Sequence, residues 1–406
     1  MTIAIAVLFT LVGAPPGPGV SGASNVPIFV PDMIVTPTRV LDGDEVRIPG
    51  SPDTFTLVWA LNHTGDPLDG KLGRNILLTA GTFPAFSFDS TAATWMQSRV
   101  REIGSEPDAP VVIRGEDGAV IDRLSDEWGS TIGVLGHGAN HTFNYIHWQN
   151  IKFEASGDAA FLIGSSADLV NGGSYTGWSF EDCEIDGGYD WYTGTGRNSK
   201  WGILTWAVSD FSFRNGYVHD IRREHAFYMH NNLGDVWLEG NVVERCGRTF
   251  CQFTARKFEF GVGPLPENPG NIFVRDNAIS DVTLGDGCEG GQAVTLTGRN
   301  RGVMVLSRNT ILFGLDQELK DALAAQGVCV PEPDGSRPIG NGAVVAWTTG
   351  SEDYETSFAM AMIGNVIIYG PDAGRTAAVS LSALDILWVS GNIILIGAAC
   401  ACCSAR

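Results

Sequence analysis

One stretch, IRREHAFYMHNN, places two arginines, a glutamate and two histidines around large apolar side chains within twelve residues. These polar residues are Arg222, Arg223, Glu224, His225 and His230. In a strand, alternate side chains share a face, so alternation predicts Phe227 and Met229 on the inner side. Tyr228 and His230 are then expected on the outer side, where an imidazole and a phenol can transfer protons.

Strands stacked on either side of this one would complete a shallow groove. The runs KWGILTWA before it and TFCQFTARK after it have the same alternation. In register, Trp206 and His230 align with a residue near Thr254 or Arg256, about 4.8 Å apart per strand. Lys200, Glu224 and His225 then gather at the edge of the groove. The alternative is ordinary surface chemistry, with the arginines paired to Glu224 and Asp220.

A row of carboxylates precedes this stretch. Asp182 and Glu184 are two residues apart and share an outward face, which Asp186 extends. Hydrolysis of a glycosidic bond needs two carboxyl groups roughly 5–9.5 Å apart. The same row also suits Ca²⁺, which takes several oxygen ligands.

The next segment, YDWYTG, is rich in aromatic residues. Its Trp191 and Tyr192 are candidate platforms for sugar rings, and loop packing is the other interpretation.

Charge restricts the partners. The chain carries a formal net charge of −20, so nucleic acid and anionic membranes are not expected as partners. Residues 197–257 differ, because nine Lys or Arg there face six Asp or Glu, a net of +3. Such a basic segment on an acidic body favours the binding of an anionic substrate.

The composition favours short strands. Glycine, at 51 of 406 residues, has nearly twice its usual share, and charged residues are few at 18%. The apolar N-terminus, closed by Pro and Gly, predicts a secretion signal over residues 1–23, too short for a confident membrane span. We therefore expect a secreted or cell-surface protein. Residues 398–406 form a Cys-rich tail.

One phrase recurs from about residue 110: a polar step, then Asn, any residue, and Ile or Val. Its copies begin at Asn241, Asn277, Asn309, Asn365 and Asn392, with Cys183 and Gly216 replacing Asn in two earlier copies. Variable intervals with a fixed frame are typical of a solenoid with loops inserted at its corners. An inward Asn at each bend can bond the Asn of the next turn and so satisfy buried polar groups.

On this phrase and the EHAFYMH strand, roughly residues 110–397 resemble the right-handed parallel β-helix, or pectin-lyase-like, superfamily. The resemblance implies an all-β solenoid. It also implies lyase chemistry, in which basic side chains neutralise a uronate carboxylate and a nearby base abstracts the adjacent proton. Arg223 and Arg256 would neutralise, and Lys200, His230 or Tyr228 would be the base.

The expected organisation follows from these patterns. Residues 24–110 cap and begin the solenoid, and residues 111–397 form it. A short helix is expected at about 315–327, in an inserted loop, because LDQELKDALAAQG has a helical period and a terminal Gly.

The sequence therefore predicts a secreted lyase for an acidic polysaccharide. A non-catalytic adhesive or filament-forming protein and a glycoside hydrolase remain as alternatives. The predicted catalytic residues are Lys200, Arg223, His225, Tyr228, His230 and Arg256. The predicted substrate-binding residues are Trp206, Trp191, Tyr192, Arg222 and Glu224. Ca²⁺, at Asp182, Glu184 and Asp186, is the one cofactor considered, and self-association is expected through the exposed end of the solenoid.

Overall fold

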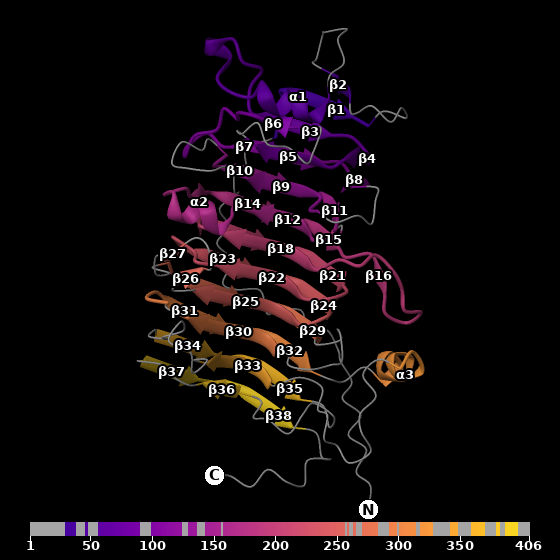
Figure 1. Ribbon diagram of the computed structural model, residues 1–406, viewed down its shortest axis with the longest axis vertical. Coiled ribbons are helices and arrows are strands. Elements are labelled where there is room, and N and C mark those ends of the chain that lie inside the picture. The colour runs from indigo at the N-terminus through magenta and orange to yellow at the C-terminus, as the bar shows by residue number, and fades with distance from the viewer. Residues whose placement is uncertain are drawn as a thin grey trace, which may run out of the picture. The chain divides into compact units, whose positions relative to one another are not determined.

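Parallel strands, stacked one coil upon the next, make up most of the described chain (Figure 1). The structure is a computed structural model. It describes residues 29–37, 45–47, 56–89, 99–123, 129–135, 143–155, 157–255, 258–259, 263–264, 270–282, 292–298, 300–313, 317–327, 342–347, 359–369, 379–381 and 386–396. Residues from Pro31 onward form one compact unit.

Three long sheets run through this unit, and almost every coil adds one strand to each. Sheet 1 contains β1 (Met33–Thr36), β2 (Glu45–Arg47), β3 (Asn75–Leu78), β7 (Val111–Gly115), β10 (Ile146–Gln149), β14 (Trp178–Glu181), β20 (Phe211–Arg214), β23 (Val236–Glu239), β28 (Ile272–Arg275), β31 (Val303–Ser307), β34 (Ala359–Ile363) and β37 (Ile386–Ser390). Sheet 2 contains β4 (Gly81–Pro84), β8 (Ala119–Asp122), β11 (Lys152–Glu154), β15 (Glu184–Asp186), β21 (Tyr217–Ile221), β24 (Val242–Cys246), β29 (Ala278–Val282), β32 (Thr310–Phe313), β35 (Val366–Tyr369) and β38 (Ile393–Ile396). Sheet 3 contains β5 (Phe86–Asp89), β6 (Arg99–Val100), β9 (Ile132–Leu135), β12 (Ala159–Ile163), β18 (Trp201–Trp206), β22 (His225–His230), β25 (Thr249–Ala255), β30 (Gln292–Gly298), β33 (Gly342–Trp347) and β36 (Val379–Leu381).

Small elements lie outside these sheets. They are the strand pairs β13 (Tyr175–Thr176) with β19 (Val208–Ser209), β16 (Tyr189–Asp190) with β17 (Thr195–Gly196), and β26 (Phe258–Glu259) with β27 (Gly263–Pro264), the 3₁₀ turn η1 (Pro67–Asp69), and the helices α1 (Leu57–Asn62), α2 (Ser166–Val170) and α3 (Gln317–Ala325). The predicted all-β, right-handed parallel β-helix is confirmed, and α3 lies where a helix was expected. Helices α1 and α2 were not predicted, because five or six residues are too short to show a helical period.

Period-two alternation builds the core. In β7, Val111 and Ile113 are fully buried between half-exposed neighbours, and they pair with Ile146 and Trp148 of β10. Aromatic side chains of successive coils then meet inside the solenoid, with Phe161 and Phe180 ring centroids 4.8 Å apart. Because the strands pair in register, each outward residue likewise lies beside its equivalents on the neighbouring coils.

The recurring asparagines form the predicted ladder at one bend. Asn309 Oδ1 accepts from the backbone N–H and the side-chain amide of Asn277, at 3.0 and 2.9 Å. Asn309 Nδ2 in turn donates to Val274 O and Asn365 Oδ1, both at 2.9 Å. The buried polar groups of the bend are therefore satisfied by the next coil, whatever loop length separates the two.

The two ends of the stack differ. Helix α1, capped by Thr56, buries Leu57, Ala60 and Leu61 over the first coils. At the other end, Ile386 and Trp388 of β37 are 64% and 65% exposed. Self-association through this end stays a prediction, and so do the domain boundaries. Residues 1–23 and 398–406 lie outside the described residues. No described helix has the length and apolar character needed to cross a membrane.

Replacing Asn309 with alanine should lower the free energy of unfolding by roughly 2–4 kcal/mol, because donors on Asn277 and acceptors on Val274 and Asn365 lose their buried partner. Chemical denaturation would measure the loss. Thr310→Ala, at the next and half-buried position, is the control. Equal stabilities of the two variants would contradict the role of the ladder.

Candidate functional site

Charged residues align on the outer face of sheet 2. Asp122, Glu154, Asp186, His219 and Glu244 occupy the same register position on five adjacent strands, from β8 to β24. Like charges opposite one another in a sheet are destabilising. Four carboxylates in this row therefore need compensation from other side chains.

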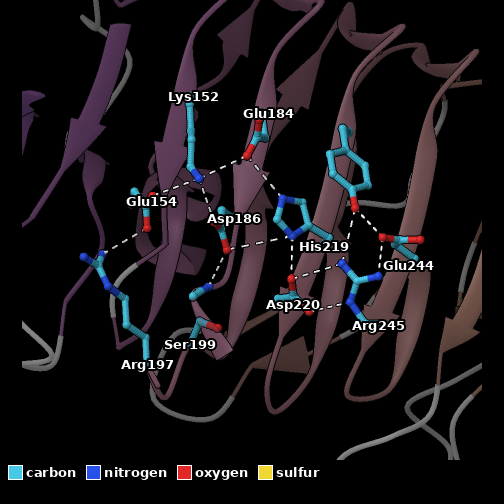
Figure 2. A network of polar contacts seen from close by, with 12 residues as sticks. Lys152, Glu154, Glu184, Asp186, Arg197, Ser199, His219, Asp220, Glu244 and Arg245 are labelled. Atoms are coloured by element: carbon cyan, nitrogen blue, oxygen red, sulfur yellow. Dashed lines mark hydrogen bonds and ion pairs between the residues drawn. The ribbon is translucent and has the colours of Figure 1, made fainter. Parts of the chain in front are cut away.

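Four cations compensate these carboxylates and create one continuous set of contacts (Figure 2). We call this set the charged network: Asp122, Lys152, Glu154, Glu184, Asp186, Arg197, Tyr217, His219, Asp220, Glu244 and Arg245.

Two cations hold the first half of the network. Lys152 Nζ lies 3.0, 3.1 and 2.7 Å from oxygens of Glu154, Glu184 and Asp186. Arg197, from the turn that follows β17, makes a two-pronged contact with Asp122 at 2.6 and 2.9 Å. Despite burial, the hydrogen bonds from Lys152 to Asp186 and Glu154 raise the pKa of its ammonium. Lys152 is therefore a permanent positive charge.

His219 lies at the centre of the network. Its Nδ1 donates to Asp220 Oδ2 at 2.6 Å, and its Nε2 faces Glu184 Oε1 at 3.2 Å. Burial alone would lower the pKa of His219, but hydrogen bonds to Asp220 and Glu184 raise it to about 9. The bond from His219 in turn lowers the pKa of Glu184, against the opposing effect of burial. At neutral pH an imidazolium thus faces an ionised carboxylate.

Arg245 closes the network on the side of β24. Its guanidinium donates to Asp220 at 2.7 and 3.2 Å and contacts Glu244 and the Tyr217 hydroxyl. Burial and a hydrogen bond to Glu244 raise the pKa of Tyr217 to about 12. Asp220 and Arg245 both have left-handed backbone conformations, with φ of 57° and 52°. This conformation is costly for residues other than glycine.

The network as a whole is acidic. Six carboxylates face four cations, counting protonated His219, which leaves −2. Glu184 is the most open of the acids at this centre, with 36% of its side chain exposed, against 17% for Asp186. A ligand on this face would therefore meet Glu184 first.

The structure groups different residues from those predicted to bind Ca²⁺. Glu184 and Asp186 come together with His219, their ligand atoms all within 4.8 Å of one another. Asp182 lies in the preceding turn, with a φ of 53° and an exposed side chain. This set does not fit a Ca²⁺ ion, because the Lys152 ammonium already contacts both carboxylates and His219 carries a proton. Ca²⁺ dependence stays a prediction.

The YDWYTG segment forms the β16–β17 hairpin and packs against α3. Tyr189 and Trp191 form a small apolar cluster with Leu319 and Leu323 of the helix. Trp191 is only 3% exposed and donates from Nε1 to the backbone oxygen of Arg245 at 3.0 Å. Loop packing, the second interpretation of this segment, is what the geometry shows for Trp191. Tyr192 remains 43% exposed.

The predicted groove residues lie on sheet 3. Trp206, His230 and Thr254 are in register as expected, but His230 is 2% exposed and stacks on Trp206 with ring centroids 4.1 Å apart. His225 is 3% exposed, and burial, with the nearby charges of Arg248 and Lys200, lowers its pKa to about 3. The two histidines are therefore covered, and His225 is uncharged. Tyr228 is half-buried beside His230.

The remaining predicted residues lie at the corner between sheets 2 and 3. Lys200, Arg222, Arg223 and Glu224 are half-buried there. Arg256 lies outside the described residues. The structure thus brings the corner residues together, and it separates them from the stacked aromatic residues at the far end of β18 and β22. Their catalytic and binding roles stay predictions.

Sequence reasoning missed Lys152, His219, Asp220 and Arg245 as members of one site. A signal for part of it was present. The residue directly after each Asn-x-Ile phrase faces outward, and in the frames of Cys183, Gly216 and Asn241 this residue is Asp186, His219 and Glu244. Reading that position down the repeat would have found the row.

No protein-family model matches the chain, and no curated protein matches it. Solved structures similar to it include the Agl-KA catalytic domain, with 10% identity over 81% of this chain and 63% of that one and a TM-score of 0.33. The catalytic domain of a GH87 α-1,3-glucanase in complex with nigerose has 8% identity over 79% of this chain and 65% of that one, with a TM-score of 0.26. The A-module of Azotobacter vinelandii mannuronan C-5 epimerase AlgE4 has 9% identity over 80% of both chains, with a TM-score of 0.22.

The chain spans less than two thirds of the first two of these structures. At such identities no residue role is carried over. The sheet pairing itself decides the architecture. The chain is a parallel β-helix protein.

The raised pKa of His219 predicts a pH-dependent stability. An imidazole with an ordinary pKa of 6.5 and a folded pKa of about 9 stabilises the fold fully below pH 6.5. This contribution, roughly 3 kcal/mol, is lost as pH rises from 6.5 through 9. Denaturant titrations across this range should show the loss in the wild type and not in His219→Gln. Parallel pH curves for the two proteins would refute the assignment.

Leu323→Ala should release α3 from the hairpin while leaving the solenoid intact, because their apolar cluster is separate from the main core. Amide hydrogen exchange should rise in residues 189–196 and 317–327 and stay unchanged in sheet 1. Val242→Ala, which shortens a 45% exposed side chain on β24, is the control. Faster exchange throughout the coils would show that α3 supports the whole fold instead.

Proposed function

We propose that the protein hydrolyses glycosidic bonds in a polysaccharide, with His219 as the proton donor and Glu184 as the proton acceptor. One observation carries the proposal: a protonated imidazole and an ionised carboxylate face each other at 3.2 Å on the outer face of sheet 2. General acid–base catalysis needs such a pair in opposite protonation states at working pH.

The contacts define the proton movements. Asp220 fixes Nδ1 of the imidazole and so aims Nε2–H at the position next to Glu184, the orienting role that an aspartate has in a catalytic triad. Glycoside hydrolysis needs the acid and the base roughly 5–9.5 Å apart, so the sugar would enter between the two side chains and break their 3.2 Å contact. His219 would then give its Nε2 proton to the leaving oxygen, while water adds to the anomeric carbon and loses a proton to Glu184. Once the product leaves, the two side chains return to hydrogen-bond distance, and Glu184 can give the proton back to His219.

Charge favours hydrolysis over elimination. Hydrolysis passes through an oxocarbenium-like, positively charged transition state, which a network of net charge −2 stabilises. Elimination next to a uronate develops negative charge, which the same network opposes. Parallel strands repeat the same outward position along the solenoid axis, so an extended polymer suits this face better than a small molecule. The proposal depends on the charged network.

β-Elimination, the leading expectation from the sequence, is the second candidate. It is favoured by the cations at the adjacent corner, where Lys200 and Arg222 form no ion pair with any described residue. Those cations could neutralise a uronate carboxylate, as elimination requires. The opposing charge of the network places this reaction second.

The test is incubation of the protein with a panel of neutral and acidic polysaccharides. New reducing ends without ultraviolet absorbance of an unsaturated product would indicate hydrolysis, and that absorbance would indicate elimination. His219→Gln and Glu184→Gln should each lower kcat by about 10²–10⁴-fold, because each removes one partner of the proton transfer.

His147→Gln is the matched control, since His147 is a half-buried histidine of sheet 1 without contact to the network. Full activity of both network variants would reject the proposed roles. Absence of any product across the panel would favour the non-catalytic alternative from the sequence, an adhesive or filament-forming protein.

A further inference from the structure

Three turns stack at the corner where the chain passes from sheet 2 to sheet 3. The backbone N–H of Arg223 donates to Ser199 O at 3.1 Å, and that of Arg248 donates to Glu224 O at 2.8 Å. Successive turns therefore repeat at the strand spacing of about 4.8 Å. Their charged side chains, which we call the basic corner, are Lys200, Arg222, Arg223, Glu224 and Arg248.

Two cations of the basic corner have no carboxylate partner among the described residues. Lys200 Nζ lies over the Trp201 ring, 4.1 Å from its centroid. The Arg222 guanidinium donates to Asn198 Oδ1 at 2.7 Å and lies 4.9 Å from the centroid of the Tyr189 ring. Neutral partners hold both cations in place without cancelling their charge.

The one acid of the corner is already engaged. Glu224 accepts from Arg248 at 2.9 Å and lies 3.4 Å from Nε2 of His225. His225 is buried, its Nδ1 has no partner among the described residues, and it feels the charges of both Lys200 and Arg248. The corner is thus a locally positive surface on a chain whose net charge is −20.

The basic corner directly follows the charged network. Asp220 ends the network on β21, and Arg222 is two residues further along the chain. The β16–β17 hairpin contacts both places, because Tyr189 faces Arg222 and Trp191 bonds the backbone of Arg245. The corner and the network therefore adjoin the same hairpin.

We infer that the basic corner binds an anionic group of the polysaccharide, a carboxylate or a sulfate ester, through Lys200 and Arg222. This inference rests on the proposed function for the identity of the ligand as a polysaccharide. The net −2 of the network repels the same anionic group. The two surfaces together therefore orient the polysaccharide, with its charged substituent at the corner and an uncharged linkage over the acid–base pair.

Affinity electrophoresis with polygalacturonate, dextran sulfate and uncharged dextran tests the inference, since binding is measured without cleavage. We expect the wild type to be retarded by one or both anionic polymers and not by dextran, with affinity falling as salt rises. Retardation by polygalacturonate alone identifies a carboxylate site, and retardation by dextran sulfate alone identifies a sulfate site. The double variant Lys200→Gln, Arg222→Gln should bind on the order of tenfold or more weakly.

The matched control is Arg214→Gln with Arg308→Gln, which removes two cations that are paired with Glu239 and Asp276 elsewhere on the solenoid. Both double variants have the same net charge. Equal weakening in the two, equal binding of dextran, or no binding of either anionic polymer would overturn the inference. If His219→Gln is inactive but still binds the anionic polymers, the binding role of the corner is supported independently of the catalytic role. If the wild type cleaves neutral polymers but does not bind the anionic ones, the binding role of the corner is rejected and the proposed function stands.

Discussion

In-register stacking of parallel coils is the constraint on which the other features of this protein depend. A slip of one residue would turn every inward side chain outward, so the buried Asn ladder and the aromatic core together fix the register. Once it is fixed, residues separated by 25 to 35 positions become neighbours on the outer face of sheet 2. The charged network exists because five coils each place one polar side chain at the same step.

The same stacking separates charges that the sequence mixes. Acidic residues face outward from sheet 2, whereas Lys200 and Arg222, which have no carboxylate partner among the described residues, lie one corner further along the chain. Each cation inside the network contacts at least one carboxylate, which neutralises its positive charge. Lys200 and Arg222 at the corner keep theirs. A long acidic polymer would meet an attractive and a repulsive surface side by side, which is a way to select orientation as well as affinity.

The sequence predicted the architecture and only fragments of the site. The Asn-x-Ile phrases predict the fold because each is a local pattern, and its Asn has the same inward position in the ladder of successive coils. The site depends on which coils lie side by side, and Asp122 and Arg197 meet across 75 residues. Local alternation placed His230 outward correctly, but its burial under Trp206 comes from a neighbouring coil. Glu184 and Asp186 were found as a row, while Lys152 between them belongs to the preceding strand.

The left-handed backbone at Asp220 and Arg245 marks two positions where the backbone and the side chain have opposite preferences. Glycine would relieve about 1 kcal/mol of backbone strain at each position, yet it would remove a half-buried ion-pair partner, which costs more. Selection for heat resistance alone would therefore retain both residues. The side chains that orient His219 are thus preserved by the demands of the fold itself, whether or not turnover is selected.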